Sequence, residues 1–482
     1  MRNAHVAAAT GFILLVSSQT AYSATLQVGP GKAYSTPCDA IAAAAAGDTI
    51  EVDATGNYAG DVCYWATDNL TIVGVNGRPK IDAAGQNAQG KAIWVIGGAN
   101  TVIENIELTG ATVPDQNGAG IRQEGKNLTV RKCYFHNNED GILAGDNDGS
   151  EILIEETEFA ENGYGDGQSH NLYINHVAKL TFRYNYSHDA KVGHLLKSRA
   201  AENHILYNRL TQENGTGSYE IDLPNGGTSL IIGNYVQQGP MSENSNIVSY
   251  GAEGIHPKNP GTDLFVINNT FYNGKGAGAF VNVGGAISTP AILRNNIFSG
   301  HDVITNQMSA VLEANFLDAS GDPMFVDLAS LDLRIKDTSP CKDAGVDPGM
   351  AAGQSLTPEE HYVHPTGHET RTAVGVIDIG AYEIGGGMVG TGGAGGATGG
   401  SGGTGASASG GAGTGGNGTG TAGGSGGNDA GSGGGGNSGG DGGCGCRVDG
   451  GAAETSGALS GAIVGLLMMV GRRRRRQNAV TS

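Results

Sequence analysis

Two short stretches of the chain carry charged side chains that could act chemically. The stretch GHLLKSRA contains Lys197 and Arg199, and SYEIDLPNGG contains Glu220 and Asp222. This set meets the needs of a β-elimination, in which a base removes the proton next to a carboxylate and a cation neutralises that carboxylate. Lys197 is the candidate base if Arg199 lowers its pKa, and Arg199 is a candidate two-point clamp for the carboxylate. Glu220 and Asp222 offer hard oxygen ligands for Ca²⁺.

Whether these side chains meet depends on how the chain repeats. Stretches such as NLTVRKCYFHNN, KLTFRYNYSHDA and NHILYNRLTQEN recur, each with alternating apolar residues and a polar turn. Spacings of 23, 26, 35 and 27 residues separate Asn185, Asn208, Asn234, Asn269 and Asn296. A period of about 25 residues with two-residue alternation inside each unit indicates strands. We therefore expect a solenoid of parallel strands, with the asparagines stacked between coils.

Aligning the coils places the charged residues side by side. The strands HNLYIN, HLLKSR, YEIDLP and NIVSYG share one register. Three outward columns are then expected: Tyr173, Lys197, Asp222 and Ser249; Asn175, Arg199 and Pro224; Asn171, Leu195, Glu220 and Ile247. His170 stacks over His194. Tyr173, Asn175 and His194 lie beside the charged residues and are predicted to contact a substrate.

The same residues admit other interpretations. Opposite charges on adjacent strands of a solvated sheet form an ion-pair ladder, worth roughly 0.2–1 kcal/mol per pair. Glu220 and Asp222 would also be a carboxylate pair for glycoside hydrolysis, because their backbones lie about 6.5–7 Å apart on one strand. A transition metal could be bound by histidines that the coils bring together, from the set His170, His176, His188 and His194.

Charge and cysteine content narrow the choice of partners and of compartment. The net charge of −19 argues against nucleic acid as a binding partner, because phosphate binding needs a basic surface. It fits a secreted protein or one that binds cations. Cys38 and Cys63 flank the first coil and could form a disulfide in an oxidising compartment. Cys133 and Cys341 lie in apolar contexts and are predicted to be small buried fillers.

The two ends of the chain indicate export. Residues 1–23 combine a basic start, a short apolar run and the small residues of AYS, which predicts a signal peptide cut after Ser23. Residues 385–443 are almost entirely Gly, Ala, Ser, Thr and Asn, which predicts a disordered linker. The apolar run 457–471 is followed by Arg472–Arg476, which predicts a short transmembrane segment with its end in the cytoplasm.

Residues 444–482 resemble the myxobacterial C-terminal sorting tag (MYXO-CTERM). The resemblance rests on the cysteines of DGGCGCRVDGG, the short apolar segment and the terminal arginine cluster, in that order. It implies a sorting peptidase as a partner and delivery to the cell surface. A plain membrane anchor is the alternative.

Residues 24–384 resemble the right-handed parallel β-helix proteins of the pectate-lyase-like superfamily. GDTIEV, the turns containing NN, SPCKDAG and DIGAYE carry this resemblance. It implies an all-β solenoid, and CDAIAAAAAGDTIEV supplies an N-terminal cap helix ending near Gly47. The segments DPMFVDLASLDLRIKDTSPCKDAG and VIDIGAYE are predicted to close the other end. No Arg-x-Pro-x-x-Arg signature of the classical pectate lyases is present, so no catalytic residue is transferred from them.

Two function hypotheses follow from these patterns. The first is an exported cell-surface polysaccharide lyase that acts on an acidic polysaccharide, with Ca²⁺ as its cofactor. The second is a non-catalytic adhesin or carbohydrate-binding protein, for which Tyr173, Tyr219 and Tyr250 would serve as aromatic platforms. The charged residues on adjacent strands favour the first.

Overall fold

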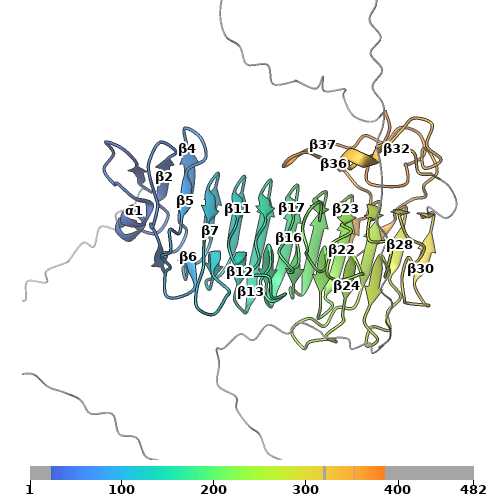
Figure 1. The fold of residues 1–482 in the computed structure, drawn as a ribbon, viewed down its shortest axis with the longest axis horizontal. Helices are drawn as coiled ribbons and strands as arrows, with labels where there is room; N and C mark the ends of the chain where they lie inside the picture. The colour runs from blue at the N-terminus through green and yellow to red at the C-terminus, as the bar shows by residue number, and fades with distance from the viewer. Residues whose placement is uncertain (1–22, 318–321, 352, 386–482) are drawn as a thin grey trace, which may run out of the picture. The chain divides into compact units, whose positions relative to one another are not determined.

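The computed structural model describes residues 23–317, 322–351 and 353–385, whose first part is a stack of coils (Figure 1). Each full coil passes through three sheets, in the order A, C and B, before it enters sheet A again. Strands at equivalent positions of successive coils pair in parallel. The predicted parallel β-helix is therefore confirmed.

The strands of each sheet follow one another at every coil. Sheet A contains β1 (Thr25–Val28), β2 (Thr49–Asp53), β4 (Thr71–Val75), β7 (Thr101–Glu104), β10 (Leu128–Arg131), β13 (Asn147–Glu155), β16 (Val177–Arg183), β19 (Glu202–Leu206), β22 (Thr228–Ile232), β25 (Leu264–Ile267), β28 (Ile292–Arg294) and β30 (Val311–Glu313). Sheet B contains β3 (Cys63–Trp65), β6 (Ala92–Ile96), β9 (Ala119–Gln123), β12 (Asp140–Ala144), β15 (Leu172–Ile174), β18 (Lys197–Ser198), β21 (Ile221–Leu223), β24 (Val248–Tyr250) and β27 (Val281–Val283). Sheet C contains β5 (Lys80–Asp82), β8 (Glu107–Thr109), β11 (Tyr134–His136), β14 (Glu158–Ala160), β17 (Tyr186–His188), β20 (Arg209–Thr211), β23 (Tyr235–Gln238), β26 (Thr270–Asn273), β29 (Ile297–Ser299) and β31 (Phe316–Leu317).

The core lies inside the coils because the strands alternate. In β10, Leu128 and Val130 are buried, while the residues between and after them are partly exposed. Equivalent residues of successive coils stack, and the rings of Phe135 and Phe159 lie 5.1 Å apart and nearly parallel. Since one coil cannot bury its own apolar edge, each coil depends on its neighbours for its core.

The predicted asparagine stack is confirmed as a hydrogen-bonded ladder. The Oδ1 atom of Asn234 accepts hydrogen bonds from the backbone N–H and the Nδ2 of Asn208, both at 2.9 Å. Asn234 in turn donates its backbone N–H and its Nδ2 to Oδ1 of Asn269. The same pattern runs through Asn185, Asn208, Asn234, Asn269, Asn296 and Asn315. These buried amides satisfy one another, which offsets the cost of removing them from water.

A short helix covers the first coil, as predicted. Helix α1 (Pro37–Ala43) packs Ala40 and Ile41 against the core. It ends earlier than expected, well before Gly47, because Ala44 already has an extended backbone. A disulfide joins Cys38 to Cys63, and Cys133 and Cys341 are free and buried, so these three predictions are confirmed.

The segment after the last coil packs on sheet C, and the prediction that it closes the end of the solenoid is wrong for the described residues. It contains β32 (Phe325–Asp327), a 3₁₀ turn (Leu328–Ser330), β33 (Asp332–Ile335), β34 (Met350–Ala351), β35 (Gln354–Ser355), β36 (Glu360–Val363) and β37 (Gly367–Thr370). Figure 1 shows β32, β36 and β37 beside the coils, near β23. The reason is that Tyr235 and Ile297, on the outer face of sheet C, form an apolar cluster with Phe325 and Leu333. Strand β30, in the last coil, stays exposed.

Other predictions lie outside the described residues. These are the signal peptide (1–23, apart from its last residue), the linker (385–443, apart from its first residue) and the C-terminal tag (444–482) with its apolar segment. In the part of the chain that the structure describes, no helix has the length and apolar character needed to cross a membrane.

Candidate functional site

The outer face of sheet B carries the charged residues singled out in the sequence. Tyr173 on β15 pairs with Lys197 on β18, and Lys197 pairs with Asp222 on β21, so the predicted outward column is confirmed. The Nζ atom of Lys197 lies 3.5 Å from Oδ2 of Asp222 and 5.5 Å from the ring centre of Tyr173. A carboxylate and an aromatic ring therefore both contact the ammonium group.

Asp222 also contacts His194, whose Nε2 lies 3.5 Å from the same Oδ2. The Nδ1 of His194 accepts a hydrogen bond from the backbone N–H of Tyr219 at 3.1 Å. Burial, followed by the charge of Lys197, holds the pKa of His194 well below its usual value. The imidazole is therefore neutral, and its proton is on Nε2, facing Asp222. Burial raises the pKa of Asp222, although the charge of Lys197 opposes this effect.

His170 repeats this arrangement one coil earlier, and its predicted stacking on His194 is confirmed. The two rings are 4.5 Å apart and nearly parallel. The Nδ1 of His170 accepts the backbone N–H of His194 at 3.0 Å, and the backbone N–H of His170 donates to Oδ1 of Asp140 at 2.7 Å. Burial lowers the pKa of His170 well below its usual value, and the charges of Lys197 and Arg199 act in the same direction. Side chains at this position thus accept backbone N–H groups from the next coil.

Arg199 is held by a loop that we call the strap, residues 251–263, between β24 and β25. Its Nη1 and Nη2 donate to the two carboxylate oxygens of Glu253, at 2.7 and 3.1 Å. Its Nε donates to the hydroxyl of Tyr173 at 3.0 Å, and Nη1 also donates to Asn225. Burial works against the charged form of Arg199, but hydrogen bonds and electrostatic attraction to Glu253 and Tyr173 together outweigh it and raise the pKa above its usual value. The expected two-point clamp exists, and the carboxylate in it belongs to the protein.

The strap is attached to earlier coils at three further points. Asn259 donates to the carbonyl of Arg199 at 2.7 Å, and His256 stacks on His176 with ring centres 4.0 Å apart. The Nζ of Lys258 lies 2.7 Å from Asp146 and 2.9 Å from Asp148. The strap therefore crosses sheet B toward the N-terminal coils, and the carboxylate of Glu253 is close enough to act electrostatically on His194.

The charged cluster is almost completely buried. Lys197 is 1% exposed and Asp222 3% exposed. The ion-pair interpretation assumed a solvated sheet, and this assumption is wrong. Desolvating two charges costs several kcal/mol per ion, so the pair is retained only because its members compensate each other. A substrate can reach Lys197 only if the surrounding groups move.

Glu220 does not belong to this outer face. Its column contains Leu195 and Ile247, which are part of the hydrophobic core, so the prediction that this column points outward is wrong. The chain is still turning into sheet B here, and strand β21 begins only at Ile221. Both carboxyl oxygens of Glu220 are buried without a hydrogen-bond partner of ordinary geometry. Burial raises the pKa of Glu220 well above its usual value.

The predicted metal ligands and the carboxylate pair are therefore not brought together. Glu220 and Asp222 point to different environments, which disfavours both a shared Ca²⁺ and glycoside hydrolysis by this pair. Among the described residues, no group of three or more His, Cys, Asp or Glu side chains could hold a metal ion. His188 lies on sheet C, away from His194 on the sheet B side, and it contacts Glu158 and Asp189.

Three residues of this site differ from the sequence-based expectation or do not appear in it. Asn175 is buried and its Oδ1 accepts the backbone N–H of His176 at 2.9 Å, so it shapes the turn. Glu253 and Asn225 were not singled out in the sequence. The spacing of 35 residues between Asn234 and Asn269, longer than the other three, was the signal that this coil carries an extra loop.

Comparison with known proteins supports the architecture. Residues 62–236 match a family model described as "Right handed beta helix region". The crystal structure of pectate lyase Pel9A aligns with a TM-score of 0.54 at 16% identity, covering 75% of this chain and 97% of that chain. A pectin methylesterase from Aspergillus niger aligns with a TM-score of only 0.30 at 14% identity, covering 68% of this chain and 93% of that chain, which is too low to support a shared fold. No curated protein matches the sequence. The family model and the pectate lyase structure show that the fold is a right-handed parallel β-helix.

Proposed function

We propose that the protein binds an acidic polysaccharide along the outer face of sheet B and cleaves it by β-elimination. The observation that carries this proposal is the convergence of Lys197, Arg199, Asp222 and His194 on one face of one sheet. Buried titratable groups with shifted pKa values, such as His194 and Asp222, are typical of functional sites. The likeness in fold to a pectate lyase agrees with a polysaccharide substrate.

In the proposed reaction the side-chain nitrogen of Lys197 takes the proton from the carbon next to the uronate carboxylate. The electron pair of that C–H bond forms a carbon–carbon double bond, and the bond to the glycosidic oxygen breaks. Water supplies the proton for that oxygen. Arg199 would hold the substrate carboxylate in the geometry in which it now holds Glu253, with two parallel hydrogen bonds. Tyr173 and Asp222 position Lys197.

This proposal requires the strap to move. Glu253 occupies the guanidinium edge of Arg199 that a substrate carboxylate would use. A uronate can therefore bind only by displacing Glu253, and the two carboxylates compete for one cation. Ca²⁺ is not assigned a role, because Glu220 is in the core and Asp222 already contacts Lys197.

The test is an assay for unsaturated uronide products, using the purified chain with acidic polysaccharides, with and without Ca²⁺. Lys197→Arg keeps the positive charge beside Asp222 but replaces an amine by a guanidinium that does not lose its proton near neutral pH. We expect activity to fall at least about 100-fold while the melting temperature is kept. Lys80→Arg, at an exposed lysine beside Asp82, is the matched control. Activity retained in Lys197→Arg would exclude Lys197 as the base.

A second candidate function is binding without cleavage, and the burial of Lys197 favours it. A base that solvent does not reach is poorly placed for proton transfer, whereas a buried ion pair can hold the adjacent strands β18 and β21 together. Retention on an acidic glycan array, with no product from any polysaccharide, would support this function. Wild-type activity would exclude it.

We also propose, from the sequence of the two ends, that the protein is exported and held at the cell surface through its C-terminal segment after recognition by a sorting peptidase. Fractionation of the producing cells, with antibodies against the β-helix and against the C-terminus, tests this. The β-helix should be accessible on intact cells. Signal confined to the cytoplasm would overturn the proposal.

A further inference from the structure

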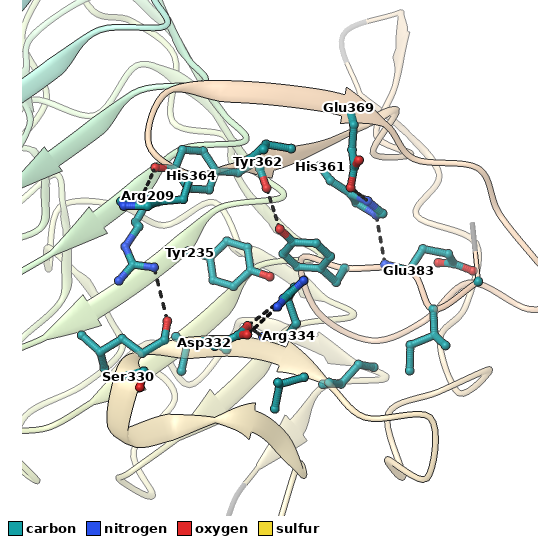
Figure 2. A pocket seen from close by; sticks show the side chains of 18 residues that line it. Arg209, Tyr235, Ser330, Asp332, Arg334, His361, Tyr362, His364, Glu369 and Glu383 are labelled. Carbon is teal, nitrogen blue, oxygen red and sulfur yellow. Dashed lines mark hydrogen bonds and ion pairs between the residues drawn. The ribbon is translucent and has the colours of Figure 1, made fainter. Parts of the chain in front are cut away.

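A second surface, on sheet C, is built for a ligand of different chemistry. A groove of about 790 Å³ lies between the outer face of sheet C and the C-terminal hairpins (Figure 2). Arg209 on β20 and Tyr235 on β23 line it from the β-helix, and the hairpins β32–β33 and β36–β37 line it from the other side. None of the residues assigned to the sheet B site lines this groove.

The floor of the groove holds two polar atoms that lack partners. Tyr235 is 4% exposed, and its hydroxyl makes no hydrogen bond, although buried hydroxyls nearly always have one. Figure 2 shows this hydroxyl directed toward the middle of the groove. The Nε of Arg209 is also buried without an acceptor. An unsatisfied buried group costs about 1–3 kcal/mol, so a ligand that bonds both atoms would recover this energy.

The rest of the Arg209 guanidinium is already engaged, so its position is set without a ligand. Its Nη2 donates to Glu213 at 2.9 Å, and its Nη1 donates to the carbonyl of Leu331 at 3.3 Å. Its guanidinium carbon lies 5.6 Å from the ring centre of Tyr186. The free Nε–H is therefore a preorganised donor.

The groove offers no uncompensated positive charge among its described lining residues. Arg334 pairs with Asp332 at 2.8 Å, and Glu383 pairs with Arg371 at 2.9 Å, as Arg209 pairs with Glu213. Burial, then the charge of Arg371, lowers the pKa of His361 to about 3, so this histidine is neutral. Burial, then the charge of Arg209, also lowers the pKa of His364. An acidic ligand would find no free cation here, and the carboxylate of Glu369 would repel it.

Aromatic rings supply the apolar part of the groove. Tyr382 lies edge-on to Tyr235 with ring centres 5.0 Å apart, and its hydroxyl is fixed to the carbonyl of Tyr362 at 2.6 Å. His364 lies edge-on to Tyr186 at 4.9 Å, so the aromatic surface continues onto β17. Rings that are rigid and carry fixed polar edges suit a ligand with flat C–H faces and hydroxyl groups at its edge.

We propose that this groove is a binding site for a neutral saccharide, independent of the sheet B site. One sugar hydroxyl would accept from Nε of Arg209 and exchange a hydrogen bond with the hydroxyl of Tyr235. The ring face would pack on Tyr382. The protein would then hold a glycan through one surface whatever the sheet B site does.

The experiment is calorimetric titration of the full chain with a panel of neutral hexasaccharides, namely gluco-, manno-, xylo- and galacto-oligosaccharides, and with oligogalacturonate as the acidic probe. Tyr235→Phe removes only the unpartnered hydroxyl and keeps the ring. We expect one neutral class to bind, and Tyr235→Phe and Arg209→Lys each to weaken it about 5- to 10-fold. Tyr272→Phe, one strand further on sheet C and outside the groove lining, is the matched control and should bind as wild type.

Folding provides a second readout that separates ligand binding from structure. Because the hydroxyl of Tyr235 has no partner, Tyr235→Phe should keep or raise the melting temperature while it lowers affinity. The proposal is overturned if no neutral hexasaccharide binds, if binding is the same in Tyr235→Phe and Arg209→Lys, or if only oligogalacturonate depends on Tyr235. If Lys197→Arg loses lyase activity but still binds the neutral hexasaccharide as wild type does, the groove on sheet C is a binding site independent of the sheet B site.

Discussion

The carboxylate of Glu253 bridges both terminal nitrogens of Arg199, at 2.7 and 3.1 Å, and so ties the strap to the neighbouring coils of sheet B. Glu253 lies 54 residues after Arg199 and reaches back two coils. Arg199 is mostly buried, whereas the Glu253 side chain is 30% exposed. The pair is therefore stronger than a surface ion pair and can still be opened from solvent.

Glu253→Gln is expected to loosen the strap. It leaves the charge of Arg199 without a carboxylate, which should lower the free energy of unfolding by about 2 kcal/mol. Backbone amides of residues 251–263 should exchange with deuterium faster, as measured by mass spectrometry. The matched control is Glu313→Gln, whose partner Arg294 lies at a more exposed site, and it should cost less than about 1 kcal/mol. Unchanged exchange in the strap would show that Glu253 does not hold it.

The Lys197–Asp222 pair predicts a pronounced asymmetry between single and double replacements. Lys197→Met leaves Asp222 buried without its cation, and Asp222→Leu leaves Lys197 without its carboxylate. Each single change should cost about 3–5 kcal/mol, whereas the double change should cost clearly less than the sum. Urea unfolding of the four proteins measures the coupling. Additive costs would show that the two side chains act independently.

The sequence alone was enough for the stack of coils and for most of the register. Tyr173, Lys197 and Asp222 form one column because two-residue alternation holds once a strand has begun. The prediction from two-residue alternation is wrong at Glu220, because Glu220 precedes the first residue of β21 and still belongs to the turn. Strand boundaries of this kind depend on the neighbouring coil, because local residue preferences do not set them.

The closing of the site by Glu253 could not be predicted, for a related reason. The strap has no repeat pattern of its own, so nothing in its sequence indicates where it packs. The same holds for the C-terminal hairpins, since the apolar residues Phe325 and Leu333 were equally suited to cap the last coil. Packing between distant segments decided both outcomes, and only three-dimensional structure shows it.

His188 is expected to make stability fall in alkaline solution. Burial works against its charged form, but hydrogen bonds to Asp189 and Glu158 outweigh this and raise its pKa to about 9. A group whose pKa is higher in the folded protein stabilises the folded state. This stabilisation is complete at pH values below the pKa of the group in the unfolded chain, roughly 6.5 for histidine. This contribution, about 3 kcal/mol, should be lost as the pH rises through 9. Thermal unfolding between pH 6 and 10 should show the decline, and His188→Gln should flatten it. An equally steep decline in His188→Gln would assign it to other groups.

Asn234 is expected to be among the most sensitive positions of the β-helix. It is fully buried, its Oδ1 accepts two hydrogen bonds from Asn208, and its Nδ2 donates to Asn269 and to the carbonyl of Ile205 at 2.8 Å. Asn234→Ala leaves these partners unsatisfied inside the stack, so the free energy of unfolding should fall by about 3 kcal/mol or more. Asn57→Ala, at an exposed position, should change the free energy of unfolding by less than about 0.5 kcal/mol.

Because each coil depends on its neighbours for its core, hydrogen exchange in Asn234→Ala should increase on both sides of Asn234, in β19 and β25. An increase in hydrogen exchange that is limited to the coil of Asn234 would show that the asparagine ladder does not transmit stability between coils.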